Sequence, residues 1–281
     1  MTNSEQICII KRCYVQVGKG GIMEKSISNA FTYMFKDSDW KYKLFVMLMF
    51  MSPPYILQGI LPQLSTMIKT PANSSIGFII ALAVVLIVVT IIFFLTLSGY
   101  SIKCANNIIY SNEDSSYDSL LPKWEDDFGQ FLKLGLKYVA AILLLMFAFL
   151  GVGLLGGIIA GIFKMLPIIS VLMAIAAVIA GLGLTYLALA LHSIFYSNYG
   201  ITSYFQFDKA IKLISYNPKR YLQIFAIYFG TAIISSLINQ SIMKSYLIVI
   251  MPIIQVYMML VWTYLIAIIF PAEPEVFFAT D

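Results

Sequence analysis

The sequence predicts an all-α integral membrane protein with six transmembrane helices, arranged as three hairpins. Of its 281 residues, 60% are hydrophobic and only 11% are charged, and the mean hydropathy is +0.87. Soluble domains carry about 25% charged residues, so this chain cannot cover itself with a surface that suits water. The charges are also confined to segments between long uncharged runs, and roughly 20 apolar residues are enough to cross a bilayer.

The uncharged runs place the six helices along the chain. They are expected near 43–62, 77–100, 138–162, 167–192, 221–240 and 246–270. The first helix is the weakest of the six, because Pro53 and Pro54 remove two backbone donors and predict a kink or break. The fourth run is longer than one span, so we expect it to include a polar cytoplasmic continuation.

Basic residues predict the orientation of these helices. Fifteen of the 18 lysines and arginines lie before the first helix, between the second and third, or between the fourth and fifth. The opposite side has only Lys69, Lys164 and Lys244, and all 14 acidic residues avoid it. Because basic residues accumulate on the cytoplasmic side, we expect a cell-membrane protein with both termini in the cytoplasm.

The first 22 residues form a separate leader in this interpretation, either disordered or not translated. They lack an apolar core of signal-peptide length. Residues 19–23, Lys-Gly-Gly-Ile-Met, can be encoded by a purine-rich ribosome-binding sequence followed by a start codon, which suggests translation from Met23. Residues 23–272 are then one membrane domain, and 273–281 are a cytoplasmic tail. Cys8 and Cys13 would be absent from the cell; as the alternative, their C-x4-C spacing could hold a metal.

A short apolar stripe precedes the first, third and fifth predicted helices. The stripes comprise Ile27, Ala30, Phe31, Met34 and Phe35; Phe128, Phe131, Leu132, Gly135 and Leu136; and Phe207, Ala210, Ile211 and Ile214. This spacing forms one face of a helix, and such a helix suits the cytoplasmic membrane interface. Each hairpin is therefore predicted to begin with an interfacial amphipathic helix. The alternative is that every membrane hairpin carries such anchors, without any internal repeat.

Small residues predict where two helices pack. Gly153, Gly157 and Gly161 follow one another at intervals of four residues in the third predicted helix. Small faces of this kind let helix backbones approach closely within the membrane. Packing inside one chain is the first interpretation, and the seam of a homo-oligomer is the second.

The acidic cluster before the third helix has three interpretations. Trp124, Glu125, Asp126 and Asp127 are consecutive. Asp127 and Gln130 have the spacing of a capping box, and acidic residues suit the positive end of a helix dipole. A docking surface for a cytoplasmic protein is the second interpretation. A metal or catalytic site is the third, and it is disfavoured because consecutive residues on a helix point about 100° apart.

The remaining chain offers little sign of catalytic chemistry. His192 is the single histidine, and we interpret it as a hydrogen-bonded anchor at the end of the fourth helix. Apart from Lys43 at the first position of the first span, the predicted spans contain no Asp, Glu, Lys or Arg, the residues that usually mark ion and proton paths. This argues against a proton- or ion-coupled transporter. We expect no cofactor, no resident metal and no nucleic-acid partner; membrane lipids are the expected partners.

Three segments together resemble a known family. They are "DSDWKYKL", "SGYSIKCANNII" and "LPKWEDDFGQFLKLGLK". They are similar to the domain-of-unknown-function family numbered 4013, multispan membrane proteins of bacteria and archaea, over about residues 26 to 270. Lys123 stands where the family pattern suggests an acidic residue, which further disfavours a metal site. A repeated unit that ends in "NPKRYL" looks more loosely like the membrane domains of some glycerophosphodiester phosphodiesterases.

Two classes of function are consistent with these observations. The first is a non-enzymatic membrane scaffold, accessory or lipid-organising module. The second is a permease or channel-like component for an apolar or lipid substrate, energised by a separate partner. The resemblance supports the architecture and leaves the function open.

Overall fold

The structure, a computed structural model, describes residues 26–68, 76–111, 120–162, 167–242 and 250–271. The predicted leader and the predicted tail lie outside these residues. The described chain is helical and contains no strand. Its α-helices are α2 (Trp40–Ile68), α3 (Ile76–Ile109), α4 (Trp124–Ile162), α5 (Pro167–Asn198), α6 (Phe207–Tyr216), α7 (Pro218–Ile242) and α8 (Met251–Ala267). Three short 3₁₀ helices accompany them, namely η2 (Ile27–Phe31), η3 (Tyr33–Lys36) and η5 (Ile201–Phe205).

Four helical segments in the described part of the chain are long and apolar enough to cross a membrane. They are Ile80–Ile109, Asp127–Phe147, Ile175–Asn198 and Pro218–Ser241. The all-helical fold is therefore confirmed, with four helices suited to a membrane, while the count of six spans stays a prediction. α8 is apolar but has only 17 residues, about 26 Å at the usual helical rise.

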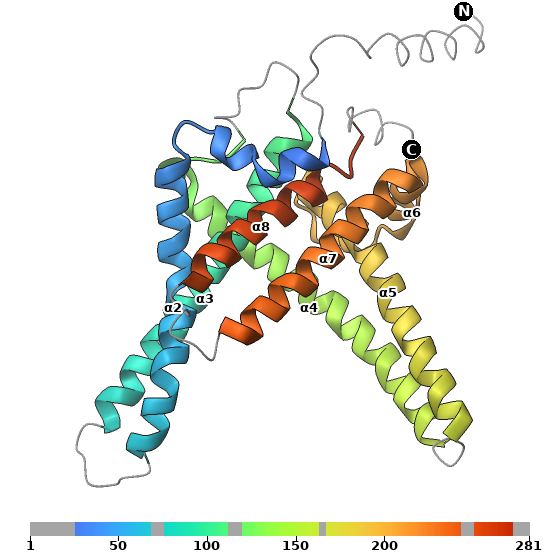
Figure 1. Cartoon of the computed structure of the whole chain (residues 1–281), viewed down its shortest axis with the longest axis horizontal. Helices are drawn as coiled ribbons and strands as arrows, with labels where there is room; N and C mark the ends of the chain where they lie inside the picture. The colour runs from blue at the N-terminus through green and yellow to red at the C-terminus, as the bar shows by residue number, and fades with distance from the viewer. Residues whose placement is uncertain (1–25, 69–75, 112–119, 163–166, 243–249, 272–281) are drawn as a thin grey trace, which may run out of the picture.

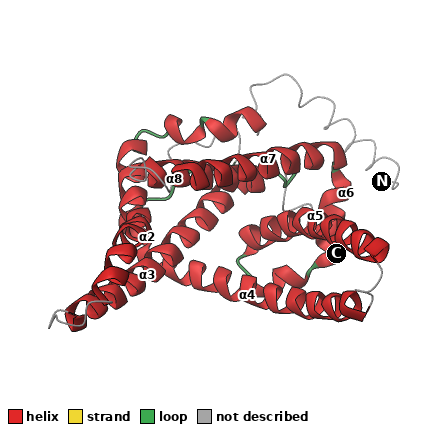
Figure 2. Ribbon diagram, turned by 60° about the horizontal axis from the view of Figure 1, so that its bottom comes forward, coloured by secondary structure: helices red, strands yellow, loops and turns green. Residues whose placement is uncertain are grey.

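The helices diverge from one end of the molecule. α2 and α3 pack together and extend to one side, while α4 and α5 extend to the other (Figure 1). α7 and α8 contact each other and lie across one face of this arrangement (Figures 1 and 2). Far from the common end, apolar side chains are exposed, including those of Val85 on α3, Phe147 on α4 and Ile179 on α5. A lipid environment suits such surfaces.

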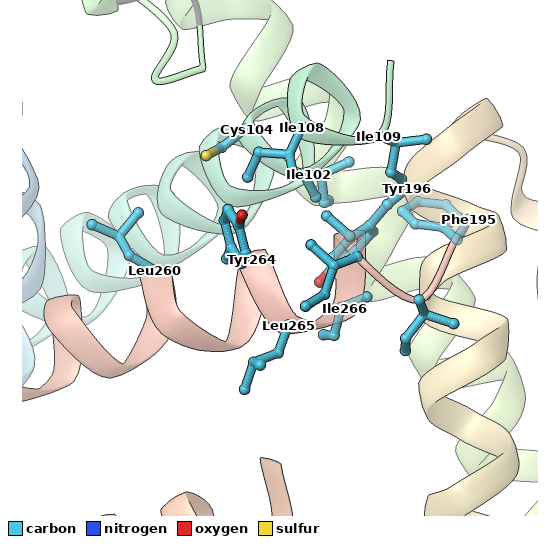
Figure 3. Close-up of a cluster of buried hydrophobic side chains, with 14 of the residues drawn as sticks. Ile102, Cys104, Ile108, Ile109, Phe195, Tyr196, Leu260, Tyr264, Leu265 and Ile266 are labelled. Carbon is cyan, nitrogen blue, oxygen red and sulfur yellow. The ribbon is translucent and has the colours of Figure 1, made fainter. Parts of the chain in front are cut away.

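The core lies near the common end, where α3, α5 and α8 meet. Figure 3 shows Ile102, Ile108, Phe195 and Tyr264 directed into this cluster; each of these side chains is at most 1% exposed. The second half of α8 is buried almost throughout. α8 is therefore the central helix of the fold rather than a peripheral span.

The segment before α2 differs from the predicted interfacial helix. It forms η2 and η3, and it buries Tyr33 and Met34 while Phe35 is 46% exposed. The Tyr33 hydroxyl donates to the Leu260 carbonyl of α8 at 3.2 Å. The tighter 3₁₀ turn changes the spacing of the buried residues from the predicted one. This segment thus closes the end of the helical core.

The other two predicted interfacial helices have different outcomes. The residues of the second stripe belong to α4 itself, just after a kink at the non-helical residue Asp127 (φ −142°, ψ 19°). The third stripe forms a separate helix, α6. On α6, however, Ala210 and Leu213 are buried while Ile211 is 57% exposed. The interfacial position predicted for this helix stays a prediction.

A buried ion pair at the start of α2 also binds the chain just before α4. Lys43 Nζ lies 2.7 Å from Asp37 Oδ2, and the two side chains are 3% and 1% exposed. Lys43 also donates to the Leu121 carbonyl at 2.9 Å. A charge out of water requires such pairing. The pair therefore fixes the chain before α4 against the corner before α2.

Two glycines allow α3 and α4 to touch backbone to backbone. A Cβ atom added at Gly99 would lie 2.8 Å from the Phe131 Cα, and one added at Gly135 would lie 2.6 Å from the carbonyl carbon of Leu95. Carbon atoms normally stay about 3.5–4.0 Å apart. Only glycine fits at these positions. The approach sets how α3 crosses α4, and it supports one wall of the site described next.

Candidate functional site

A cavity of about 300 Å³ lies where the central helices meet. We call it the inner cavity. Its polar lining comes from Ser98 and Ser101 on α3, Tyr138 on α4, His192 and Tyr196 on α5, Tyr228 on α7, and Gln255, Trp262 and Thr263 on α8. Met51, Phe94, Leu97, Met259 and Ile266 complete the lining. Polar side chains from five helices thus converge on one space.

A second cavity of about 370 Å³ lies next to the inner cavity. We call it the α5 groove. It is lined by Gly181, Leu184, Thr185, Ala188, Leu189, His192 and Tyr228, and most of these residues are apolar. His192 and Tyr228 line both cavities. At these two side chains the α5 groove therefore adjoins the inner cavity, whose lining carries more polar groups.

The small hydroxyls of the inner cavity donate to carbonyls of their own helices. Ser98 donates to Phe94 O at 2.8 Å, and Ser101 donates to Ser98 O at 2.8 Å. Thr263 donates to Met259 O at 2.7 Å. A hydroxyl has one donor and two acceptor lone pairs. These oxygens therefore offer acceptors to the cavity.

His192 is held by its own helix and by aromatic rings. Its Nδ1 lies 2.6 Å from the Ala188 carbonyl. Because a carbonyl only accepts, Nδ1 carries the hydrogen, and Nε2 of the neutral ring is an acceptor. The Tyr138 and Tyr204 rings meet the imidazole edge to face, with centroids at 5.7 and 5.2 Å. The anchoring predicted for this histidine is present, and the same ring lines both cavities.

Hydrogen bonds and ring contacts fix the wall formed by α7 and α8. Trp262 Nε1 donates to Thr231 Oγ1 at 3.0 Å. The Tyr228 and Trp262 rings lie 5.7 Å apart between their centroids. Side chains held in this way keep the inner cavity open rather than collapsing into it.

The α5 helix ends against α3. Asn106 Nδ2 donates to the Tyr196 and Ser197 carbonyls at 2.9 and 3.0 Å. These carbonyls lie in the last turn of the helix, which leaves carbonyl groups without helical partners. The next residue after α5, Tyr199, adopts φ +56°, a left-handed conformation common after helix ends. The contact sets the position of His192 and Tyr196 relative to α3.

Trp124 is largely buried and joins α2, α3 and α4 beside the Gly99 contact. Its side chain is 7% exposed and stacks against Tyr100 at 4.3 Å and Phe50 at 5.0 Å, measured between ring centroids. Its remaining exposed edge lines a surface cavity, and its role in docking a partner stays a prediction.

The acidic neighbours of Trp124 have separate environments. Glu125 is exposed and, with Asp39, Tyr42, Lys43, Lys123 and Trp124, lines a surface cavity of about 310 Å³. Asp127 breaks the helical geometry of α4. With its amide nitrogen towards that carboxylate, Gln130 donates to the two Asp127 oxygens at 3.0 and 3.1 Å. The Asp126 side chain lies outside the described residues. Within the described chain, no group of three or more His, Cys, Asp or Glu residues could hold a metal.

The surroundings of the predicted packing residues lie outside the described residues, whereas the predicted helix-break residues are described. Gly153, Gly157 and Gly161 are helical within α4, but their surroundings are not described, so the packing prediction stays open. α2 runs as one helix through Pro53 and Pro54, so the predicted break does not occur. Proline is tolerated in a membrane helix where neighbouring groups satisfy the backbone.

The inner cavity was not predicted from the sequence, although its residues follow helical spacing. Ser98 and Ser101 are three residues apart, His192 and Tyr196 are four apart, and Gln255 and Thr263 are eight apart. Each pair lies on one helical face. Polar residues on one face of otherwise apolar spans could have identified the lining.

The comparisons with known proteins place the chain in a family. The family model described as "Protein of unknown function (DUF4013)" matches residues 82–243, more than half of the chain. The match begins in α3 and ends just after α7. No curated protein and no solved structure matches the chain, so nothing supports the likeness to glycerophosphodiester phosphodiesterases. The chain belongs to the DUF4013 family of proteins of unknown function.

Proposed function

We propose that this protein is a non-enzymatic, lipid-organising module of the cell membrane that holds an amphiphile in the inner cavity. The observation that carries the proposal is the pairing of the two cavities. The inner cavity, whose apolar lining carries several polar side chains, adjoins the α5 groove, which carries fewer, and His192 and Tyr228 belong to both. An amphiphile has the same division into a polar end and an apolar chain.

The chemistry of the lining supports a binding role rather than a catalytic one. Ser98, Ser101 and Thr263 donate to backbone carbonyls of their own helices. A catalytic serine or threonine instead requires a base within hydrogen-bond reach. Among the described lining residues there is no carboxylate to orient His192 as a base. The site can therefore accept hydrogen bonds, and we assign it no reaction.

The charge distribution supports the proposed topology, with both termini in the cytoplasm. The fifteen basic residues assigned to the cytoplasmic side include Lys43 at the start of α2 and Lys219 at the start of α7, and these two helix ends lie near the common end of the helices (Figure 1). In this topology the polar end of the amphiphile faces the cytoplasmic half of the bilayer.

Partners other than lipid remain proposals. Lys123 and Glu125 are exposed at the surface cavity before α4, which suits a cytoplasmic protein that carries charges of both signs. The glycine run of α4 suits a second copy of the chain. Neither partner is needed for the lipid-binding proposal.

A permease for an apolar or lipid substrate is the second candidate, because the same adjoining cavities suit a substrate path. Reconstitution of the purified protein into liposomes distinguishes the two. A lipid-organising module gives no transfer of lipid between leaflets above that of empty liposomes. Transfer by the protein alone, or stoichiometric co-purification with an ATPase, would instead support the permease.

Lipid retention tests the proposal itself. We expect native mass spectrometry of the detergent-purified protein to show bound lipid, and Ser101→Leu to reduce it at least fivefold by filling the inner cavity. Ser236→Leu is the matched control, because Ser236 is exposed on α7. Equal lipid retention by Ser101→Leu and the wild-type protein would overturn the proposal.

A further inference from the structure

We infer that the inner cavity selects an amphiphile with an uncharged, hydroxyl-bearing headgroup, such as a diacylglycerol, over a phospholipid. The inference rests on the proposed lipid binding and names the class of lipid. Three observations carry it. The lining hydroxyls already donate their hydrogens, the described lining residues carry no charge, and the α5 groove lies beside the cavity.

The lining offers acceptors to a ligand that brings donors. The hydroxyls of Ser98, Ser101 and Thr263 have given their hydrogens to carbonyls at 2.7–2.8 Å. Each oxygen keeps lone pairs that a ligand hydroxyl can use. The headgroup must therefore donate, as an alcohol does and a phosphodiester oxygen does not.

His192 adds an acceptor at the junction of the cavities. Its Nδ1 is committed to the Ala188 carbonyl at 2.6 Å, which leaves Nε2 to accept. Gln255 and the tyrosine hydroxyls can both donate and accept. This mixture suits a hydroxyl group, which also does both.

The absence of charge in the described lining disfavours a phosphate. No lysine, arginine, aspartate or glutamate is among the described residues that line either cavity. A phosphate is usually bound by arginine, lysine or free backbone N–H groups, and a charge without such partners is costly to bury. Lys43, a buried cation elsewhere in the fold, is already paired with Asp37.

The α5 groove gives the apolar chain a place beside the headgroup. Leu184, Ala188 and Leu189 line it next to His192 and Tyr228. Leu184 is 37% exposed on α5, and Leu182, just before it, is 40% exposed. The groove therefore adjoins a surface that lipid covers, and a chain can reach it from the bilayer.

The test compares two short-chain probes by native mass spectrometry, with the purified full chain in a detergent that the probes can displace. The probes are dioctanoylglycerol, whose headgroup is one uncharged hydroxyl, and dioctanoylphosphatidylcholine, whose headgroup carries a charged phosphodiester and no hydroxyl. We expect the wild-type protein to bind dioctanoylglycerol at least tenfold more tightly. Tighter binding of the phospholipid would overturn this inference and leave lipid binding intact. Binding of neither probe, together with no co-purified lipid, would overturn both this inference and the proposed function.

Substitutions of lining residues test whether the inner cavity is the site that selects the uncharged lipid. Thr263→Val keeps the shape and removes the acceptor oxygen, and His192→Phe keeps an aromatic ring and removes Nε2. Each should weaken dioctanoylglycerol binding about 2- to 10-fold, the range for one hydrogen bond, and leave phospholipid binding unchanged. If either variant fails to elute as a monodisperse peak, Ser101→Ala replaces it in the binding assay. Ser236→Ala is the control. Unchanged selectivity in the folded variants would overturn the cavity assignment.

Discussion

Replacing Gly135 with alanine should destabilise the protein, because the contact between α3 and α4 has no room for a methyl group. The added Cβ would lie 2.6 Å from the carbonyl carbon of Leu95 and 3.0 Å from its Cα. Carbon atoms pack at about 3.5–4.0 Å, so the two helices would have to separate by roughly 1 Å. The obstacle is backbone, which cannot turn aside as a side chain can.

The size of the effect follows from two opposing terms. Overpacking costs typically about 1–3 kcal/mol, and the upper end applies to a backbone obstacle. Alanine is favoured over glycine in a helix by about 1 kcal/mol. The net loss is about 2 kcal/mol, which lowers the ratio of folded to unfolded protein by roughly 30-fold.

Gly129→Ala is the matched control, because Gly129 lies in the same helix and an added Cβ meets nothing within 4 Å. The assay is the temperature at which half of the detergent-purified protein leaves the monodisperse size-exclusion peak. Gly135→Ala should lower this temperature, while Gly129→Ala should leave it unchanged or raise it. Equal stability of the two variants would refute the proposed backbone contact.

Three further predictions use the same stability assay. Lys43→Met should cost about 3–5 kcal/mol by leaving the buried Asp37 carboxylate unpaired, whereas Lys41→Met at an exposed site should cost little; equal losses would contradict the buried pair. Asn106→Ala should cost about 1–3 kcal/mol by removing both hydrogen bonds to the end of α5, and an unchanged midpoint would show that these bonds are dispensable. Burial raises the pKa of the Tyr33 hydroxyl well above its usual value near 10; because the unfolded chain then ionises first, stability should be constant below about pH 10 and fall above it. If the stability of a Tyr33→Phe variant falls as steeply above pH 10, this tyrosine is not the cause.

The sequence predicted the helical membrane class and the approximate place of each long helix, because uncharged runs are a direct requirement of the bilayer. The ends were predicted less well. α3 continues to Ile109, beyond Lys103, and α4 begins at Trp124, well before the expected 138. A charge marks where an apolar run stops but does not stop a helix, since lysine is a good helix former.

The interior arrangement could not be read from hydropathy. Lipid and protein cores are equally apolar, so the residues of α8 look like any other span although the second half of the helix is buried almost throughout. The close contacts at Gly99 and Gly135 also escaped prediction, because an isolated glycine shows no periodic pattern. The polar side chains of the inner cavity come from five helices, and only the structure brings Ser101, His192 and Thr263 to the same space.

A density map of the protein in a lipid nanodisc tests the central claim most directly. The account predicts an elongated density in the α5 groove, with its polar end in the inner cavity beside His192, Ser101 and Thr263. An inner cavity filled by repacked side chains, or by water alone with no chain in the groove, would contradict it.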